Sequence, residues 1–304
     1  MRRIQYLFNG CPFSRTALLG VLILASAGCN TSSTSTSTTS SGPLAGTPYY
    51  HQTWLATSSD GVSWNVTGNM IFNHASVPGA VRFNDQVYLY FVDAEDYANE
   101  KIGVAISSDG GRTFGAKQSA SFTGSDTSYP VDPDPIVDSG KIRLTYLANF
   151  NGGSVRKIAT GTSSDGINFS DVQVIATGNE YYVDPDLFNY NGEWNLFVHT
   201  WDTGTMVRYK SAYPTHDFTL VSTFNSVGGA ISATVSFNST YSTYFFGSSN
   251  ICRALFNGDT LTTVNTSLIS MASVTTNGGT IADPTVVVNS ASDFAMYFKF
   301  QPAN

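Results

Sequence analysis

Short apolar runs, interrupted by polar residues, follow one another along most of the chain. Three of them, at residues 87–90, 142–146 and 194–197, read Val-Tyr-Leu-Tyr, Ile-Arg-Leu-Thr-Tyr and Trp-Asn-Leu-Phe. β-Branched and aromatic residues are frequent in these runs, and Gly, Asn, Asp and Ser separate them, as is typical of strands joined by tight turns. The pattern therefore predicts an all-β protein.

One turn sequence recurs. Residues 58–64 read Ser-Ser-Asp-Gly-Val-Ser-Trp, residues 107–114 read Ser-Ser-Asp-Gly-Gly-Arg-Thr-Phe, and residues 163–169 read Ser-Ser-Asp-Gly-Ile-Asn-Phe. Their final aromatics are 50 and 55 residues apart, and a worn fourth copy lies at 215–218. Such a period is typical of propellers. The segments resemble the Asp boxes of sialidases and other propellers, which implies structural roles for Asp60, Asp109 and Asp165.

A second repeat lies between these turns and begins at residues 77, 132, 184, 232 and 283. Each copy reads as a strand, a tight turn and a second strand, so the spacing predicts five units. The last unit has only two strands before the chain ends, and residues 52–72 hold two strands without an inner pair. Together they complete one sheet. We therefore predict a five-bladed β-propeller over residues 47–304, closed by N-terminal strands that complete the last blade.

The N-terminal region has a different composition. Arg2, Arg3 and Arg15 precede an apolar run at 17–25, too short to span a bilayer. Residues 26–29, Ser-Ala-Gly-Cys, resemble the lipobox of bacterial lipoproteins. This implies a signal peptide at 1–28, a lipidated Cys29 and an outer-membrane destination. The Ser/Thr-rich segment within 29–46 is expected to be a disordered tether. An ordinary signal peptide cleaved nearby is the alternative.

Composition excludes several classes of protein. The formal net charge is -7 and charged residues make up 12% of the chain, which argues against nucleic-acid binding. Of three cysteines only Cys252 lies in the predicted domain, so no internal disulfide is expected there, and no zinc-type Cys spacing occurs. We expect a monomer that contacts the membrane only through its lipid.

Carboxylates begin several of the repeats. In a propeller the inner strands start around one end of the central channel, so residues at these starts converge: Val77, Asp132, Asp184, Ser232 and Asp283. Asp134 and Asp186 follow two residues on. Mutual repulsion and burial raise the pKa values of some members, which can separate an acid from a base. Two such carboxyl groups are what glycoside hydrolysis requires.

The Asp-Pro strand starts and the five-unit count resemble the arabinanase-like propellers, family 43 of the glycoside hydrolases and its relatives. The resemblance implies Asp132 as base and Asp184 as the residue that tunes the pKa. It places the acid at Ser232, and no Glu stands there. Glu180 and Glu95 are therefore alternative acids. The predicted catalytic set is Asp132, Asp184, Asp283 and Glu180, with Asp134, Asp186, Trp201 and His199 contacting the substrate.

Other interpretations of the same residues remain open. An Asp before Pro can close a turn without contacting a ligand. Several carboxylates around the axis could also hold calcium, although the predicted reaction requires no cofactor. Trp201 and Trp54 are candidates for sugar stacking or for core packing. The alternative function is a non-catalytic surface lipoprotein that binds glycan or protein.

Overall fold

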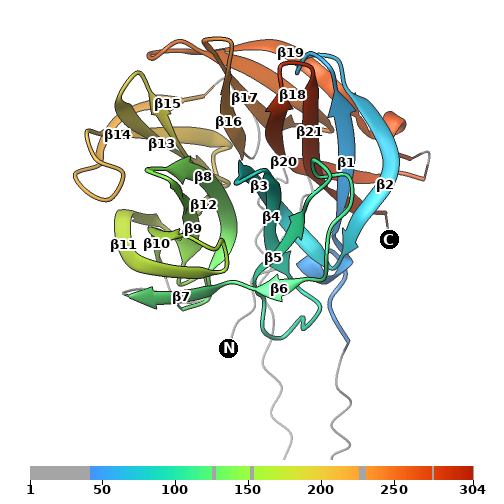
Figure 1. The fold of residues 1–304 in the computed structure, drawn as a ribbon, viewed down its shortest axis with the longest axis horizontal. Helices are drawn as coiled ribbons and strands as arrows, with labels where there is room; N and C mark the ends of the chain where they lie inside the picture. Colours follow the sequence, from blue (N-terminus) through green and yellow to red (C-terminus); the bar gives the residue numbers. More distant parts are fainter. Residues whose placement is uncertain (1–41, 125–127, 151–153, 226–230, 276, 304) are drawn as a thin grey trace, which may run out of the picture.

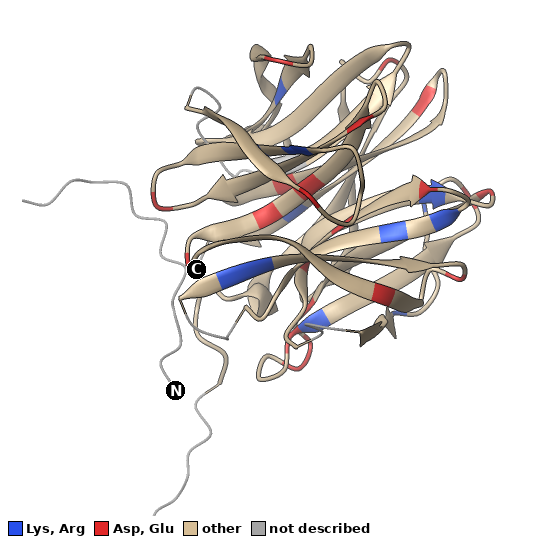
Figure 2. Ribbon diagram, turned by 90° about the vertical axis from the view of Figure 1, so that its left-hand side faces the viewer, with Lys and Arg blue, Asp and Glu red and all other residues tan. Residues whose placement is uncertain are grey.

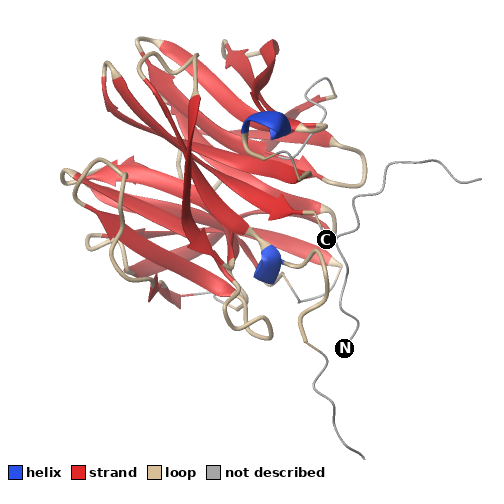
Figure 3. Ribbon diagram, turned by 90° about the vertical axis from the view of Figure 1, so that its right-hand side faces the viewer, coloured by secondary structure: helices blue, strands red, loops and turns tan. Residues whose placement is uncertain are grey.

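The structure, a computed structural model, describes residues 42–124, 128–150, 154–225, 231–275 and 277–303. Within these ranges the chain is mostly strand, and two short helical turns lie beside the sheets (Figure 3). They are the 3₁₀ helices η1 (Pro48–Tyr50) and η2 (Met271–Ser273). No helix in the described part is long and apolar enough to cross a membrane. The signal peptide, Cys29 and most of the predicted tether lie outside these ranges.

The strands form five sheets around a common centre (Figure 1). Blade 1 contains β3 (Ala75–Phe83), β4 (Gln86–Asp93), β5 (Lys101–Ser107) and β6 (Gln118–Ser119). Blade 2 contains β8 (Val131–Asp138), β9 (Lys141–Ala148), β10 (Val155–Ser163), β11 (Asn168–Asn179) and an outer β7 (Ser121–Gly124). Blade 3 contains β12 (Tyr182–Tyr190), β13 (Glu193–Thr200), β14 (Thr205–Ser211) and β15 (Thr219–Phe224).

The last two sheets complete the ring. Blade 4 contains β16 (Ile231–Phe237), β17 (Thr240–Gly247), β18 (Asn250–Phe256) and β19 (Leu261–Ser270). Blade 5 contains β20 (Gly279–Ser290), β21 (Asp293–Pro302), β1 (Gln52–Ser58) and β2 (Asn65–Asn73). Strand β1 pairs with β21, with Gln52 opposite Phe300 and Ser58 opposite Phe294. The predicted five-bladed propeller, closed by N-terminal strands, is confirmed.

The inner strand of each blade lines the centre. Strand β20 contacts β3, β3 contacts β8, β8 contacts β12, β12 contacts β16, and β16 contacts β20. The labels of these strands surround the middle of the ring in Figure 1. We call the end at which the inner strands begin the channel mouth, and the opposite end the distal face.

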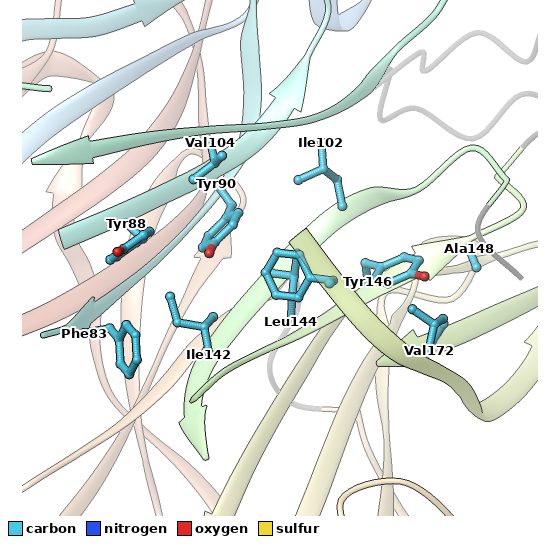
Figure 4. Packing of buried hydrophobic residues seen from close by; sticks show 12 residues of the cluster. Phe83, Tyr88, Tyr90, Ile102, Val104, Ile142, Leu144, Tyr146, Ala148 and Val172 are labelled. Atoms are coloured by element: carbon cyan, nitrogen blue, oxygen red, sulfur yellow. The ribbon is translucent and has the colours of Figure 1, made fainter. Parts of the chain in front are cut away.

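Apolar side chains fill the space between neighbouring blades. Five buried clusters exist in the described chain, one for each blade interface. Figure 4 shows the cluster between blades 1 and 2, where Tyr90 of β4 faces Ile142 and Leu144 of β9. Burying one such side chain contributes roughly 1.5–3 kcal/mol, so these interfaces supply most of the drive to form the ring.

The three repeated turns lie on the distal face and connect neighbouring blades. In the middle copy, the Asp109 carboxylate accepts the N–H groups of Arg112 (2.9 Å) and Thr113 (3.0 Å), which closes the turn. In each copy a tyrosine of the preceding blade donates its hydroxyl to a glycine carbonyl of the turn. The pairs are Tyr90 with Gly166 (2.8 Å), Tyr244 with Gly61 (2.7 Å) and Tyr297 with Gly111 (2.8 Å). The aromatic that ends each turn packs against the same tyrosine.

Candidate functional site

Every inner strand has a β-bulge close to its start at the channel mouth. The pairing shifts at Ser76/Gly79, Val131/Asp134, Val183/Pro185, Ile231/Ala233 and Ala282/Thr285. Four bulges contain a non-glycine residue with positive φ: Val77 (45°), Asp132 (54°), Asp184 (47°) and Asp283 (49°). Proline follows each of them and has no N–H to lose from the ladder.

This backbone conformation is unfavourable for side chains with a Cβ, and for β-branched Val77 it is a rare one. Its recurrence in four blades means that the ring imposes it at the mouth. Strained residues of this kind cluster at ligand sites. The bulges bring Val77, Asp132, Asp184 and Asp283 to the wall of one cavity on the channel axis.

The cavity has a volume of about 20 Å³ and is also lined by Gly79 and Ala233. That is space for about one water molecule, since one water-sized sphere needs roughly 10–15 Å³. A sugar ring therefore cannot enter the channel, and a ligand would have to lie across the mouth.

Asp132 and Asp184 are adjacent in this wall. The Asp184 N–H points to Asp132 Oδ2 at 3.4 Å, a long contact that links blade 2 to blade 3. Burial, helped by the charges of Asp283 and Glu100 and opposed by this contact and by Lys299, raises the pKa of Asp132 to about 7. Burial also holds the pKa of Asp184 well above its usual range, with Asp132 and Asp283 adding to the effect. The pair therefore retains a proton near neutral pH.

Lys299 supplies positive charge to this group. Its Nζ lies 2.5 Å from Asp283 Oδ2, and both side chains are buried. Burial alone would lower the pKa of Lys299, but Asp283, Asp184 and Asp132 together raise it, so the ammonium is retained. His51 packs nearby, and burial together with the charge of Lys299 lowers its pKa to about 3. The mouth thus combines a buried ion pair with two neighbouring carboxyl groups whose pKa values are raised.

Sequence reasoning missed two members of this group, Lys299 and Glu100. Lys299 lies within the run Tyr-Phe-Lys-Phe at 297–300, and a lysine in an otherwise buried strand is a signal that could have revealed it. Glu100 lies in the loop before β5 and its charge reaches Asp132. No pattern in the sequence marks this loop residue.

Asp134 and Asp186 form a second layer below the mouth. Asp134 Oδ2 accepts the N–H of Leu187 in the next blade at 2.7 Å. Asp186 accepts the N–H of Thr234 at 3.2 Å and its hydroxyl at 2.6 Å, again across a blade interface. Burial raises the pKa of Asp186 to about 7 and that of Asp134 well above its usual range. These two carboxyl groups, predicted as substrate contacts, join blades 2, 3 and 4, and Asp134 also lines the cavity at the mouth.

Two predicted site residues, Trp201 and Glu180, lie on the rim at blade 3 together with Tyr181. Trp201 follows β13 and has 48% of its surface exposed. Its ring meets that of Tyr181 edge to face, with 5.1 Å between centroids. Glu180 precedes Tyr181, its carboxylate bonds the Tyr181 hydroxyl, and its backbone oxygen accepts Arg156 Nε at 3.2 Å. Glu180 and Trp201 therefore lie beside the start of β12, which carries Asp184.

The other candidates have different surroundings. His199 is buried in β13 opposite Val183, beside the start of β12, and desolvation lowers its pKa to about 4. Trp54 packs against Phe300 in the core between blades 4 and 5. Glu95 is exposed at the rim, 3.8 Å from Lys117. The side chain of Ser232 lies outside the described residues.

Among the described residues, no group of three or more His, Cys, Asp or Glu side chains is arranged to hold a metal ion. The ammonium of Lys299 occupies the neighbourhood of the three mouth aspartates. Calcium binding in the channel stays a prediction.

Comparison with known proteins identifies likeness in fold. No family model and no curated protein matches the chain. Three solved structures illustrate the similarity. An α-L-arabinofuranosidase from Clostridium thermocellum is 17% identical, with a TM-score of 0.53 over 68% of this chain and 80% of its own. A family 43 β-xylosidase/α-arabinofuranosidase from a compost microbial metagenome, in complex with xylotriose, is 18% identical (TM-score 0.52, 66% and 78%). A family 43 enzyme from Xanthomonas citri complexed with xylotriose is 15% identical, with a TM-score of 0.52 over 67% of this chain and 80% of its own.

The chain has the fold of these glycoside hydrolases. Identities this low show the architecture alone, because one fold hosts many functions. Any function has to be argued from the mouth itself.

Proposed function

We propose that this protein is a cell-envelope lipoprotein whose propeller acts on carbohydrate at the channel mouth. One observation carries the proposal. Asp132 and Asp184 lie side by side with raised pKa values, next to a rim that exposes the aromatic pair Tyr181 and Trp201. Carboxyl groups that differ in protonation, close to an aromatic platform, suit the hydrolysis of a glycosidic bond.

The roles follow from the protonation states. Asp132, with a pKa of about 7, is partly ionised at neutral pH and serves as the base that removes a proton from the attacking water. Asp184 stays protonated and keeps negative charge away from Asp132. The acid that protonates the leaving oxygen comes from the rim. Glu180 beside Trp201 and Glu95 at the rim are the candidates from the sequence, and Glu100 near Asp132 is a third.

Recognition of the sugar falls to the rim, since the cavity on the axis is too small for a ring. Trp201 and Tyr181 offer apolar faces on which a sugar can stack while their polar edges stay in water. Asp283, paired with Lys299, adds to the effect of burial in raising the pKa of Asp132.

A second function, glycan or protein binding without turnover, is favoured by one observation. Asp132 and Asp184 are largely enclosed under a mouth with space for about one water molecule. In this alternative the carboxyl groups maintain the ring, and the exposed rim alone contacts the ligand.

Turnover assays with the domain from Gly42 onward separate the two. We expect release of reducing sugar from at least one of arabinan, xylan, fructan and sialoside substrates, with a bell-shaped pH profile. Asp132→Asn should reduce the rate at least 100-fold while glycan binding is kept. Asp85→Asn, an exposed carboxylate of the β3–β4 turn, is the matched control. Binding without turnover, unaffected by Asp132→Asn, supports the alternative.

Calcium is tested in the same assay. If the carboxyl groups act without a metal, EDTA treatment leaves the rate unchanged. A loss restored by calcium alone would show that the channel holds this ion.

Lipidation is tested in cells. Palmitate labelling and membrane fractionation of the full chain should give a labelled protein in the outer-membrane fraction, and Cys29→Ser should abolish both. An unlabelled, secreted wild-type protein would favour an ordinary signal peptide.

A further inference from the structure

A larger cavity lies on the distal face, far from the mouth. It has a volume of about 180 Å³ and lies between blades 4 and 5. Its lining residues include Phe237, Ser242, Tyr244, Arg253 and Phe294. The turn after β1 and the turn between β16 and β17 form its outer edge.

The other two interfaces that carry a repeated turn provide an internal comparison. Between blades 1 and 2, Tyr88 packs directly on Gly166, where an added Cβ would lie 2.4 Å from the Tyr88 ring. Between blades 5 and 1, Asn289 donates to Gly110 O at 2.9 Å, and Arg112 pairs with Asp293 beside it.

At the interface of blades 4 and 5 the filling is looser: a Cβ added to Gly61 would lie 3.3 Å from the Phe294 ring. Tyr88 lies two residues before Tyr90, the residue that donates to Gly166. Two residues before Tyr244, which donates to Gly61 in the same way, stands Ser242. A small side chain thus replaces a tyrosine, and the space it leaves forms part of the cavity. The opening is therefore a local departure from a pattern that the same chain fills elsewhere.

Arg253 gives the cavity its chemistry. Its guanidinium donates to the hydroxyl oxygen of Ser242 from Nε (3.1 Å) and Nη2 (2.8 Å), and it also bonds the Tyr244 hydroxyl. The other five arginines of the described chain each donate to a carboxylate or a backbone carbonyl: Arg82, Arg112, Arg143, Arg156 and Arg208. Within the described residues, Arg253 has only hydroxyl partners. Its charge is therefore not paired with a carboxylate, and the N–H groups that Ser242 does not use can bind one.

The remaining walls narrow the choice of ligand. The rings of Phe237, Phe294 and Tyr244 offer apolar surface, and a cavity of roughly 150 Å³ can hold a six-membered ring. At the outer edge, Asp60 and Asn238 are exposed acceptors. A bare inorganic anion would meet repulsion from Asp60, whereas hydroxyl groups on a ring would donate to it.

We propose that this cavity binds a sugar acid, a single six-membered ring with a carboxylate facing Arg253 and hydroxyl groups facing Asp60. Because the site lies on the distal face, it does not depend on the activity proposed for the mouth.

Calorimetric titration of the domain from Gly42 onward, at constant ionic strength, tests this assignment. The probes are glucuronate and galacturonate, their neutral parents glucose and galactose, and acetate as a carboxylate without a ring. We expect a sugar acid to bind at least tenfold more tightly than its neutral parent and than acetate. Equal binding of neutral sugar or acetate, or no binding of either acid, overturns the proposal.

Two variants locate the site. Arg253→Gln should weaken sugar-acid binding at least tenfold, and Ser242→Tyr, which restores the filling seen between blades 1 and 2, should abolish it. Arg82→Gln, at an exposed arginine on the same face, should leave it unchanged, as should Asp132→Asn at the mouth. Circular dichroism confirms that each variant is folded. Retained affinity in both Arg253→Gln and Ser242→Tyr would contradict the assignment, and loss with Asp132→Asn would move the ligand to the mouth.

Discussion

At the scale of single residues, Lys299 is the most consequential side chain at the mouth. It lies within 2.5 Å of Asp283 and offsets the charges of three aspartates in a buried place. Removing one member of a buried pair leaves the other charge without compensation. This destabilises the fold more than replacing both members by apolar residues does.

We therefore expect Lys299→Met to lower the free energy of unfolding by about 3–5 kcal/mol at neutral pH. Urea denaturation of the domain measures it, and Lys141→Met, at an exposed position, is the control. The double variant Lys299→Met/Asp283→Leu should recover part of the loss. A change below about 1 kcal/mol in the single variant, the range of a surface pair, would contradict the ion pair.

The buried carboxyl groups also predict how stability varies with pH. Asp132 and Asp186 have pKa values of about 7 in the folded chain and about 3.9 when unfolded. Between these values the unfolded state loses protons that the folded state keeps, so stability falls as the pH rises from about 4 to about 7. For each of the two carboxyl groups, this loss of folding stability amounts to up to about 4 kcal/mol. His51 and His199, with lowered pKa values, act in the opposite direction below about pH 6.5.

Comparison of variants isolates the carboxyl contribution. In Asp186→Asn, the fall in stability between pH 4 and pH 7 should be smaller than in the wild type, by urea denaturation at each pH. Asp171→Asn, at an exposed residue, should follow the wild-type curve. Parallel curves for Asp186→Asn and the wild type would show that Asp186 titrates normally.

At the scale of elements, the tyrosine bonds to the repeated turns join neighbouring blades. Tyr90 is buried and donates to Gly166 O at 2.8 Å. Tyr90→Phe removes the donor and leaves a buried carbonyl without its partner, so we expect a loss of about 1–3 kcal/mol in stability. Thermal and urea unfolding measure it, with Tyr213→Phe, an exposed ring, as control. An unchanged midpoint would mean that water replaces the bond.

Several elements could be predicted from sequence because their geometry requires particular residues. A bulge followed by proline appears in the sequence as a recurrent dipeptide, and this dipeptide allowed four of the five inner strands to be located. The four dipeptides are Val77-Pro78, Asp132-Pro133, Asp184-Pro185 and Asp283-Pro284. Strand β7 could not be predicted, because it is short and pairs in parallel with a strand that follows it in sequence.

The site itself was only partly predictable. Convergence of Asp132, Asp184 and Asp283 follows from blade geometry, and the structure brings them to one cavity. The charges that act on these aspartates come from Lys299 on another strand and Glu100 in a loop. No repeat in the sequence specifies the positions of these two residues. The cavity beside Arg253 was also missed. It arises because Ser242 has no aromatic ring at the position where blade 1 carries Tyr88.

At the scale of the whole molecule, few charges cover a large ring. Lys and Arg segments and Asp and Glu segments are interspersed along the ribbon in the view of Figure 2. With a net charge of -7, this arrangement provides no broad attraction for a polyanion. Recognition by this protein therefore has to rely on local sites such as the two described here.

Closure of the ring by β1 and β2 predicts the effect of truncation. A chain starting at Gly42 should unfold in one cooperative transition. One starting at Ala75 lacks both strands and leaves the edge of β21 unpaired, so we expect it to aggregate or to lose cooperative unfolding. Light scattering and calorimetry test this. A truncated chain that stays soluble and unfolds cooperatively would show that blade 5 does not need β1 and β2.

The pairing of Gln52 with Phe300 also has a consequence for the timing of synthesis. The two residues are separated by about 250 others, and ribosomes add roughly 5–20 residues per second. Strand β1 therefore waits on the order of 12–50 s for its partner, while blades 1 to 4 can form one after another. During that interval the nascent chain carries two strands with an open edge, which makes protection by chaperones most important for the segment that is made first.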